Sequence, residues 1–253
     1  MRVRKKPQFL LPGAPLSFPD PNQADDEGML AIGGDLSPER LLFAYAHGIF
    51  PWYDDGLPPM WWSPNPRTVL DPEHLHVSRS MKRVLRSGRF TVSFDRAFRE
   101  VMLECGRERD QGTWILPEMV DAYCHLHELG HAHSVEVWQS ERLVGGLYGV
   151  QLGALFAAES MFHRERDASK VALISAVEHL FQSHIELFDV QFLTPHLQSL
   201  GAYEIPRARY LELVEKAVVK RSVSVRRREV AVAAPMANQA RLPAASGGDW
   251  EEF

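Results

Sequence analysis

The chain has 253 residues, of which 45% are hydrophobic and 24% are charged, a composition typical of a globular protein with a sizeable core. The formal net charge of -5 argues against a protein that coats nucleic acid indiscriminately, although it leaves room for a local basic patch. The apolar stretch near the amino terminus ends at Pro12 and Gly13 and is too short for a signal peptide. No run of the sequence approaches the roughly 20 apolar residues of a membrane span. Two cysteines without metal-site spacing favour a reducing, cytoplasmic location.

The first 66 residues are rich in Pro, Gly and aromatic residues, and turns are expected to dominate there. One helix is predicted within them. Ser37 suits its N-cap, Pro38 its first position, residues 39–47 its body and Gly48 its end. We expect residues 1–66 to form a small α+β N-terminal domain.

From residue 67 onward the pattern changes to regular secondary structure. Helices are predicted over residues 78–87, 97–106, 117–129, 169–183 and 207–218. Strands are predicted over residues 90–94, 133–138, 143–150, 155–161 and 187–193. The second, third and fourth of these strands have hairpin spacing and predict an antiparallel meander. The mixed order indicates an α+β domain over residues 67–222, and the composition of residues 223–253 predicts a disordered tail.

The string His127-Glu-Leu-Gly-His131 matches the HExxH signature of zinc peptidases. In that signature both histidines must share one face of a continuing helix. Gly130 is a natural helix end and the alternation from His133 is typical of a strand, so we expect His131 to lie beyond the helix. A third ligand at the usual spacing is missing. The sequence therefore favours an interpretation without zinc, with a metallopeptidase as the alternative.

Four basic residues recur at helical spacing with no acidic residue among them: Arg79, Lys82, Arg83 and Arg86. They share one face of the predicted helix, and such a stripe can neutralise phosphate groups. Like charges at these spacings cost a helix a few tenths of a kcal/mol each. An anionic partner is therefore favoured over a merely solvated face.

Polar residues interrupt two otherwise apolar strands. Asp189 and Gln191 are two positions apart, so their side chains are expected on the same face of the strand. A buried carboxylate is costly without a partner, and the pair is either a satisfied structural network or a functional site. Glu159 interrupts the strand 155–161 in the same way.

The order of hairpin strands, helix and further strand resembles the acyl-CoA N-acyltransferase-like (GNAT-type) core. Coenzyme A enzymes of that fold hold the pyrophosphate in a glycine-containing loop at a helix start, whereas residues 163–172 contain no glycine. The sequence therefore predicts an acyl donor other than coenzyme A. The basic helix suggests a donor carried on nucleic acid.

Taken together, strings spread over residues 18–214 resemble the leucyl/phenylalanyl-tRNA-protein transferase family. They include Gly28-Met-Leu-Ala-Ile-Gly-Gly-Asp-Leu-Ser-Pro38, Gly48-Ile-Phe-Pro-Trp52, Trp61-Trp-Ser-Pro64, Ser78-Arg-Ser-Met-Lys-Arg83, Thr113-Trp-Ile115, His127-Glu-Leu-Gly-His-Ala-His133, Glu159-Ser-Met-Phe162 and Ala168-Ser-Lys170. The resemblance implies transfer of Leu, Phe and, to a lesser extent, Met from aminoacyl-tRNA to proteins that begin with Arg or Lys. It implies that the product is marked for degradation by the bacterial N-end rule, and that neither a metal nor a cofactor is needed.

The resemblance also assigns roles to residues of this chain. The Asp-x-Gln strand pair falls on Asp189 and Gln191, and the pocket glutamate falls on Glu159. The aromatic residues that shape the site for the tRNA 3′ end fall on Tyr45, Trp52, Trp114 and Tyr123. The helix that grips the tRNA acceptor and D-stem backbone falls on Arg79, Arg83 and Arg86. Two positions depart from the family pattern, Asp167 in place of a common Asn and Val190 in place of a small residue.

An aminoacyl ester is already activated, so the enzyme has to orient two substrates, free an amine of its proton and stabilise an oxyanion. The hypothesis is that Asp189, through or beside Gln191, helps to deprotonate the amine, and that Gln191 or a backbone amide meets the oxyanion. Glu159 is expected near the cationic end of the acceptor. The apolar pocket for the Leu or Phe side chain is expected from Leu147, Phe156, Met161 and Leu173.

Two other protein classes fit parts of the sequence. Aminoacyl-tRNA-dependent peptidyl transferases of cell-wall bridges use related chemistry, but they are usually longer and carry a duplicated acyltransferase domain. A tRNA-binding module without transferase activity would leave the acidic and amide residues structural, and its binding would fall with salt. The chain is expected to be a monomer without a membrane partner.

Overall fold

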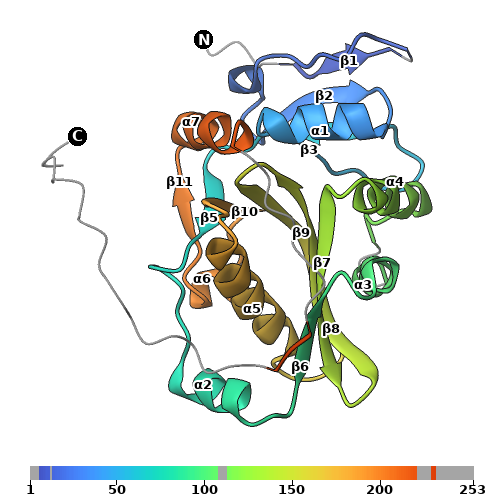
Figure 1. Ribbon diagram of the computed structural model, residues 1–253. Helices are drawn as coiled ribbons and strands as arrows, with labels where there is room; N and C mark the ends of the chain where they lie inside the picture. Colours follow the sequence, from blue (N-terminus) through green and yellow to red (C-terminus); the bar gives the residue numbers. More distant parts are fainter. Residues whose placement is uncertain (1–5, 12, 108–112, 221–228, 232–253) are drawn as a thin grey trace, which may run out of the picture.

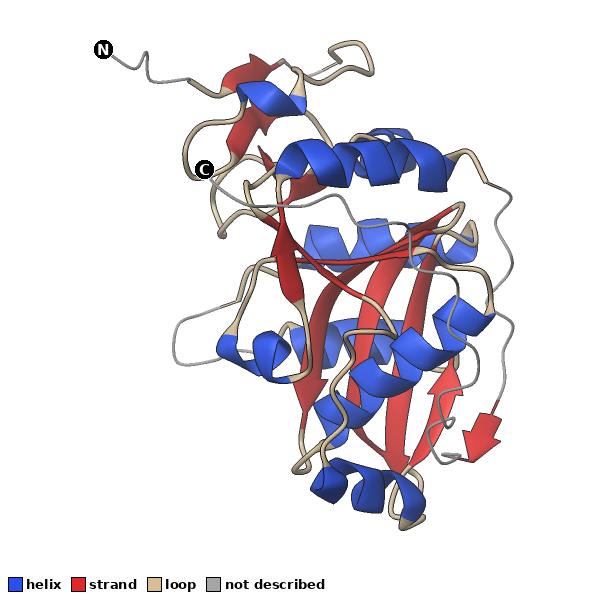
Figure 2. Cartoon of the chain, turned by 90° about the vertical axis from the view of Figure 1, so that its left-hand side faces the viewer, coloured by secondary structure: helices blue, strands red, loops and turns tan. Residues whose placement is uncertain are grey.

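The computed structural model describes residues 6–11, 13–107, 113–220 and 229–231. Its described strands form two sheets, a four-stranded sheet of order β1-β2-β4-β3 and an eight-stranded sheet of order β11-β5-β10-β9-β8-β7-β6-β12 (Figure 1). Helices pack against the large sheet (Figure 2). The predicted mixed α+β architecture is confirmed.

The small sheet is built by the amino-terminal region. Its elements are β1 (Gln8–Leu10), the 3-10 helix η1 (Pro21–Gln23), β2 (Met29–Gly33), α1 (Pro38–Ala46), β3 (Phe50–Pro51) and β4 (Met60–Trp62). Helix α1 begins as predicted, because the Ser37 side chain accepts a hydrogen bond from the amide of Arg40. Turns were expected to dominate this region, and the four strands in it were not predicted. With two to five residues each, they are too short to show an alternating pattern.

The large sheet contains the predicted meander. Its strands are β5 (Arg67–Leu70), β6 (Thr91–Phe94), β7 (Ala132–Gln139), β8 (Arg142–Leu152), β9 (Leu155–His163), β10 (Leu187–Gln191), β11 (Tyr203–Ile205) and β12 (Glu229–Ala231). Strands β7, β8 and β9 are antiparallel neighbours, whereas β10 runs parallel to β9. The β9 and β10 pairing ends at Ala157 and Asp189, although β9 continues for six more residues. The two strands therefore part along the second half of β9.

Three hydrophobic clusters of the described residues pack against this sheet, and the smallest of them includes Tyr210, Val214 and Ala217. The helices are α2 (Arg79–Arg86), α3 (Phe98–Cys105), α4 (Pro117–Glu128), α5 (Ala168–Gln182), α6 (Pro195–Ser199) and α7 (Arg207–Val218). Helix α5 packs in one core, while α3 and α4 pack in another together with α1 and the small sheet (Figure 1). The small sheet and the large sheet thus share one continuous core.

Short elements account for most of what the sequence patterns did not predict. Strands β5 and β11 and helix α6 have three to five residues each and carry little periodicity. Residues 229–231 form β12 against β6, so the prediction of a tail without structure does not hold for them. The rest of residues 223–253 lies outside the described residues. Within the described parts of the chain, no helix has the length and apolar character needed to cross a membrane.

The turn between α6 and β11 requires glycine. Gly201 has a φ of 97°, and a Cβ atom added there would lie 1.9 Å from the carbonyl oxygen of His74. We expect Gly201→Ala to destabilise the protein by roughly 3 kcal/mol or more, because a left-handed backbone and a clash with backbone add together. Gly56→Ala is the matched control, since φ is 77° there and nothing lies within 4 Å; it should cost about 1 to 2 kcal/mol. Urea denaturation measures both, and equal losses would contradict the expectation.

Candidate active site

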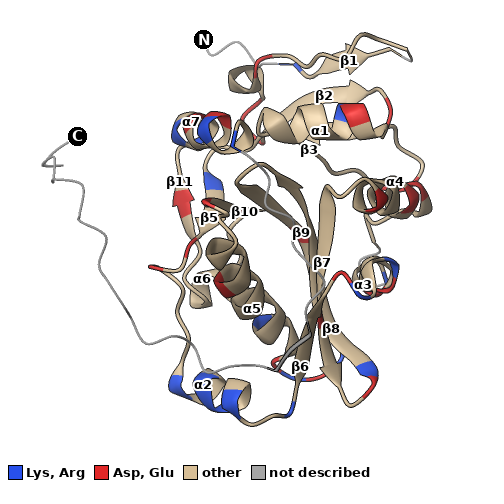
Figure 3. Cartoon of the chain, viewed as in Figure 1, with Lys and Arg blue, Asp and Glu red and all other residues tan. Residues whose placement is uncertain are grey.

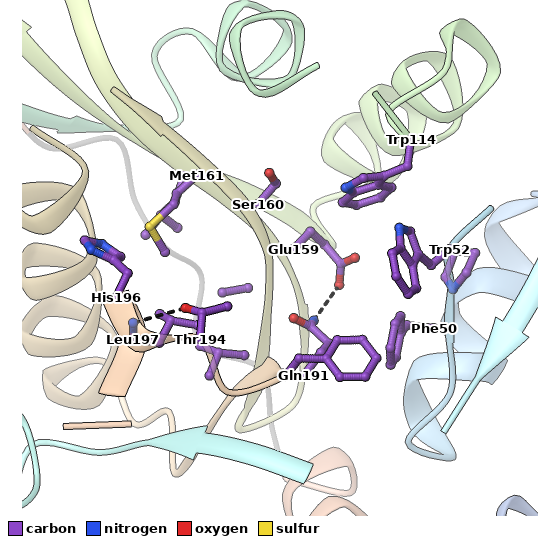
Figure 4. Close-up of a pocket in the computed structure, with 15 residues that line it drawn as sticks. Phe50, Trp52, Trp114, Glu159, Ser160, Met161, Gln191, Thr194, His196 and Leu197 are labelled. Atoms are coloured by element: carbon purple, nitrogen blue, oxygen red, sulfur yellow. Dashed lines mark hydrogen bonds between the residues drawn. The ribbon is translucent and has the colours of Figure 1, made fainter. Parts of the chain in front are cut away.

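A pocket of about 360 Å³ opens where β9 and β10 part. Its walls come from residues 158–161 of β9, from residues 190–192 at the end of β10, from the segment 50–52, from Trp114 and from the start of α6. Figure 4 shows Trp52 and Trp114 at one end, Met161 and His196 at the other, and Glu159 with Gln191 between them. The early end of the strand pairing therefore creates the pocket.

One end of the pocket is aromatic. The Phe50 and Phe192 rings are 5.9 Å apart between centroids, and those of Trp52 and Phe192 are 5.8 Å apart. Trp52 is 40% exposed and Phe192 is 39% exposed, so both offer ring surface to a ligand. Trp114 lies beside Trp52 at the same end (Figure 4). Such surfaces suit the stacking of a nucleobase.

Towards the other end, Met161 and Leu197 are apolar, while Thr194 and His196 are polar (Figure 4). Leu147, Ala158 and Val190 are further apolar residues of the pocket wall. Leu147 is fully buried, and Met161 is partly accessible. Unbranched and γ-branched side chains therefore find a hydrophobic surface beside the polar centre, which is what a Leu or Phe side chain requires.

Glu159 and Gln191 form the polar centre. The Gln191 Nε2 atom donates a hydrogen bond of 3.2 Å to Glu159 Oε1. Burial raises the pKa of Glu159 to about 8; the Tyr45 hydroxyl opposes this rise through a hydrogen bond, and the negative charge of Asp189 adds to it. A carboxyl group with a pKa near 8 can both accept and return a proton close to neutral pH.

Asp189 is held in a buried network of donors. Its oxygens accept hydrogen bonds from Arg67 Nε at 2.8 Å and Arg67 Nη2 at 2.6 Å, from the Tyr210 hydroxyl at 2.8 Å and from the Gln191 amide at 3.0 Å. Asp189 is 0% exposed and Arg67 is 1% exposed. The guanidinium also lies over the rings of Phe50 and Tyr210 and donates to the Gly48 carbonyl oxygen. The carboxylate is thus neutralised and its acceptor positions are occupied.

A bulge separates the surroundings of Asp189 from those of Gln191. The register of β10 against β5 shifts between these two residues, and Gln191 has a φ of 55°. Val190 and Gln191 both line the pocket, whereas Asp189 does not. Simple alternation, on which the expectation of a shared face rested, fails because a bulge adds a residue to one strand.

The structure places six of the predicted pocket residues on the pocket wall: Trp52, Trp114, Leu147, Glu159, Met161 and Gln191. Tyr45 and Tyr123 lie behind it, where their hydroxyl groups are hydrogen-bonded to each other and less than 3% of each residue is exposed. Phe156 and Leu173 belong to the core beneath the sheet and are not on the wall. Phe156 lies where β9 is still paired with β10 and packs on Phe188, so it is too deep to reach the opening.

Sequence reasoning missed Phe50, Phe192, Thr194, His196 and Leu197 on the wall. Phe50 stands inside the Gly48-Ile-Phe-Pro-Trp52 string, which was a usable signal. The other four follow Gln191 closely, but only the turn from β10 into α6 brings them back to the pocket. A five-residue helix gives no periodic pattern from which that turn could be predicted.

The basic stripe lies on α2, at the end of the molecule opposite α1 (Figure 3). Arg79, Lys82, Arg83 and Arg86 are exposed, while Met81 and Leu85 anchor the opposite face. Within the described residues none of the four forms an ion pair. The predicted one-sided basic surface is therefore present.

The HExxH string does not form a metal site. Helix α4 ends at Glu128, so His131 lies beyond it, as predicted. His127 Nδ1 is 2.7 Å from the Ala132 carbonyl oxygen, and His133 Nδ1 is 2.8 Å from Asp95 Oδ2. Across the ranges that the structure describes, no group of three His, Cys, Asp or Glu side chains is arranged to hold a metal ion.

Comparison with known proteins relates this geometry to a family. The family model described as leucyl/phenylalanyl-tRNA protein transferase matches residues 69–215, and the model of the N-terminal domain of the same family matches residues 34–65. The chain belongs to the leucyl/phenylalanyl-tRNA protein transferase family.

Individual relatives agree with the family models. The leucyl/phenylalanyl-tRNA-protein transferase of Anaeromyxobacter sp. (strain Fw109-5) is 56% identical over 206 residues, which cover 80% of this chain and 88% of that protein. Proteins of the same name are 53% identical in Desulfatibacillum aliphaticivorans (79% and 88% covered) and 54% identical in Edwardsiella ictaluri (strain 93-146) (78% and 82% covered). The structure of L-PGS from Bacillus licheniformis aligns with a TM-score of 0.36 at 13% identity, over 76% of this chain and 74% of that one, and this similarity is too weak to support a conclusion.

In this member of the transferase family, both matched regions contribute to the pocket. Phe50 and Trp52 come from the part matched by the N-terminal domain model, whereas Glu159 and Gln191 come from the part matched by the larger model. Arg67 lies between the two matched ranges and bonds to both sides, through Gly48 and Asp189. The pocket therefore lies where the two matched regions meet.

The raised pKa of Glu159 predicts a dependence of stability on pH. The folded protein disfavours the ionised carboxyl, so wild-type stability is lost as the pH rises from about 4.5 towards 8 and then levels off. Glu159→Gln cannot ionise and should gain stability relative to the wild type over this range, by at most about 1.4 kcal/mol per pH unit. Chemical denaturation at pH 5, 6.5 and 8 measures the difference. A difference that stays constant between pH 5 and 8 would contradict the assigned burial of this carboxyl.

Proposed function

We propose that this protein transfers Leu, Phe and, less efficiently, Met from aminoacyl-tRNA to the α-amino group of proteins that begin with Arg or Lys, which marks them for N-end rule degradation. The observation that carries the proposal is the order of surfaces in the pocket. The separated strands carry three surfaces in order: an aromatic end suited to the terminal adenosine, a polar centre of Glu159 and Gln191, and an apolar end. Family membership supports the same activity.

The proposal includes a division of the chain. Residues 1–66 would form a small N-terminal domain and residues 67–222 an acyltransferase-like catalytic domain of the GNAT type. The separate small sheet and the boundary between the two family models, after residue 65, support this division. The parting of two parallel strands, β9 and β10, supports the GNAT-type assignment.

The substrates are oriented by the two ends of the pocket. The side chain of the transferred residue occupies the apolar end beside Leu147 and Met161, and the adenosine stacks on the Trp52 and Phe192 rings. The ester carbonyl then lies near Gln191. One hydrogen of its Nε2 group bonds Glu159, and the other can bond the developing oxyanion.

We assign the proton transfer to Glu159. As the amine attacks the ester carbon, the C–N bond forms and Glu159 accepts a proton from the nitrogen. When the bond between the carbon and the ribose oxygen breaks, the same carboxyl returns the proton to that oxygen. A pKa near 8 suits both steps, since the α-amino group of a protein has a reference pKa of about 7.7 to 8.0.

Asp189 then serves as a positioning residue instead of the base. Its acceptor positions are filled by Arg67, Tyr210 and the Gln191 amide, so it holds the left-handed backbone that carries the Gln191 side chain. Tyr45, held by Tyr123, supports the Glu159 carboxyl from behind. Neither Tyr45 nor Tyr123 would touch substrate.

The stripe on α2 would bind the tRNA backbone. Arg79, Lys82, Arg83 and Arg86 are exposed and unpaired within the described residues, and phosphate contacts of this kind fix orientation without reading sequence. The partners are therefore aminoacyl-tRNA and the acceptor protein, and we expect a monomer to suffice.

The function is tested with leucyl-tRNA that carries labelled leucine and two reporter proteins, one beginning with Arg and one with Gly. Because the family resemblance implies acceptors that begin with Arg or Lys, label is expected on the Arg reporter alone, and it should survive removal of the tRNA. Label on neither reporter, despite salt-sensitive tRNA binding, would identify a binding module and contradict the proposal.

The proton-transfer assignment is tested with single-turnover rates between pH 6 and 9. Glu159→Gln should lower the rate about 100-fold or more and leave only the rise of the rate with pH that comes from ionisation of the acceptor amine. Tyr210→Phe removes one hydrogen bond to Asp189 but leaves its ion pair with Arg67, so it should lower stability by about 1 kcal/mol and keep the pH profile. If Tyr210→Phe changed the dependence of the rate on pH while Glu159→Gln kept the wild-type dependence, the base would be Asp189 and not Glu159.

A further inference from the structure

A second cavity, of about 500 Å³, adjoins the pocket. Met161 and His196 line both spaces, so these two residues form the boundary between them. They lie at the end of the pocket opposite the Trp52 and Trp114 rings (Figure 4). The proposed function assigns this end to the side chain of the transferred residue. The space behind the boundary therefore bears on which residues can be transferred.

The two sides of the boundary differ in polarity. On the side of the pocket, apolar residues of the wall are Leu147, Ala158, Val190 and Leu197. On the far side the lining is mostly polar or charged, and it consists of Glu104, Arg107, Phe162, His163, Arg164 and Ser169. His163 and Arg164 are exposed, so the second cavity reaches solvent. A polar group of a ligand is therefore costly to bury on the first side and can be solvated on the second.

The charges of the second cavity pair with one another. Arg164 Nε donates to Glu104 Oε2 at 2.5 Å, and Arg107 Nε lies 3.3 Å from Glu104 Oε1. Both guanidinium groups therefore already face a carboxylate. A neutral group that both donates and accepts hydrogen bonds, such as an amide, needs no counter-charge from this lining and suits it better than an ion does.

Met161 stands at the boundary because of the strand that carries it. It belongs to the part of β9 beyond the end of the pairing with β10, and its register partner on β8 is Leu147. Leu147 is fully buried, whereas Met161 is partly exposed. A methionine side chain is unbranched and apolar, so it fills an irregular gap and offers a polar group only a weak acceptor.

The two polar residues at this end of the pocket leave the boundary uncharged. Burial lowers the pKa of His196, and the positive charges of Lys170 and His163 lower it further, which favours the neutral imidazole. The His196 ring points away from Gln191 (Figure 4). The hydroxyl oxygen of Thr194 caps α6, where it accepts a hydrogen bond of 3.2 Å from the amide of residue 197.

We propose that Met161 is a specificity-determining residue that closes the side-chain end of the pocket against the polar cavity behind it. The inference rests on the proposed function and extends it. A Leu, Phe or Met side chain ends at the boundary with apolar atoms. A side chain that carries a hydrogen-bonding group beyond the length of Phe has to bury that group against Met161 without a partner. When Met161 is shortened, the same group enters the second cavity.

The test uses one tRNA charged with phenylalanine, with 4-carbamoylphenylalanine or with 4-isopropylphenylalanine. The two long side chains have the same number of non-hydrogen atoms and a similar shape, but only the carbamoyl group forms hydrogen bonds. In the wild type, kcat/KM should be lower for the carbamoyl donor than for the isopropyl donor. In Met161→Ala the ratio of carbamoyl to isopropyl should rise roughly tenfold, as expected when a polar group gains the partners that it lacked.

Met161→Gln is a second variant for the case that Met161→Ala does not fold. It keeps the length of the side chain and adds an amide at the boundary, so it should raise the ratio as well. Leu197→Ala is the matched control. Leu197 lines the same end of the pocket but not the second cavity, so its truncation adds space without polar surroundings, and the ratio should stay at the wild-type value.

Two results would overturn the inference: an unchanged ratio in both Met161 variants, or an equal rise in Leu197→Ala. Transfer of phenylalanine from the same tRNA by the wild type is measured alongside. Failure of the proposed function is distinguishable, because the wild type would then transfer phenylalanine to neither the Arg reporter nor the Gly reporter. Transfer of phenylalanine together with an unchanged ratio would remove the role of Met161 alone.

Discussion

The structure depends on one buried ion pair. Arg67 and Asp189 lie on the neighbouring strands β5 and β10, are almost fully excluded from water and form two hydrogen bonds with each other. Removing either partner alone would leave a buried charge uncompensated, a loss of about 3 to 5 kcal/mol. Because Arg67 also bonds the Gly48 carbonyl oxygen and Asp189 bonds the Tyr210 hydroxyl, the pair joins the amino-terminal region, the large sheet and α7 at the edge of the pocket.

Because of this ion pair, the two neighbouring acidic residues Asp189 and Glu159 have different surroundings. Asp189 forms an ion pair with Arg67, whereas Glu159 has an amide, a hydroxyl and the charge of Asp189 nearby, and burial raises the pKa of Glu159 to about 8. One carboxylate therefore holds the backbone of Gln191, and the other can exchange a proton near neutral pH. At Glu159 desolvation outweighs the opposing charge of Arg67, and the pKa of this carboxyl is therefore raised.

Periodic patterns predicted the long elements well. The meander β7 to β9, the cap of α1 and the end of α4 before His131 follow from alternation, from Ser37 and from Gly130. Elements of two to five residues were missed because they contain less than one period of any pattern. In the site, Phe156 and Leu173 were predicted as part of the apolar pocket for the Leu or Phe side chain, but the depth at which strands part is not encoded locally.

By itself the sequence determined the family, the mixed fold and the chemical types that the pocket needs: aromatic rings, an acid, an amide and a basic helix. Only the tertiary structure decided which groups face a ligand. The bulge between Asp189 and Gln191, the withdrawal of Tyr45 and Tyr123 behind the wall, and the meeting of His163 and Arg164 with His196 all depend on contacts between distant segments. Such contacts set burial and neighbouring charge, and these quantities fix what each side chain can do.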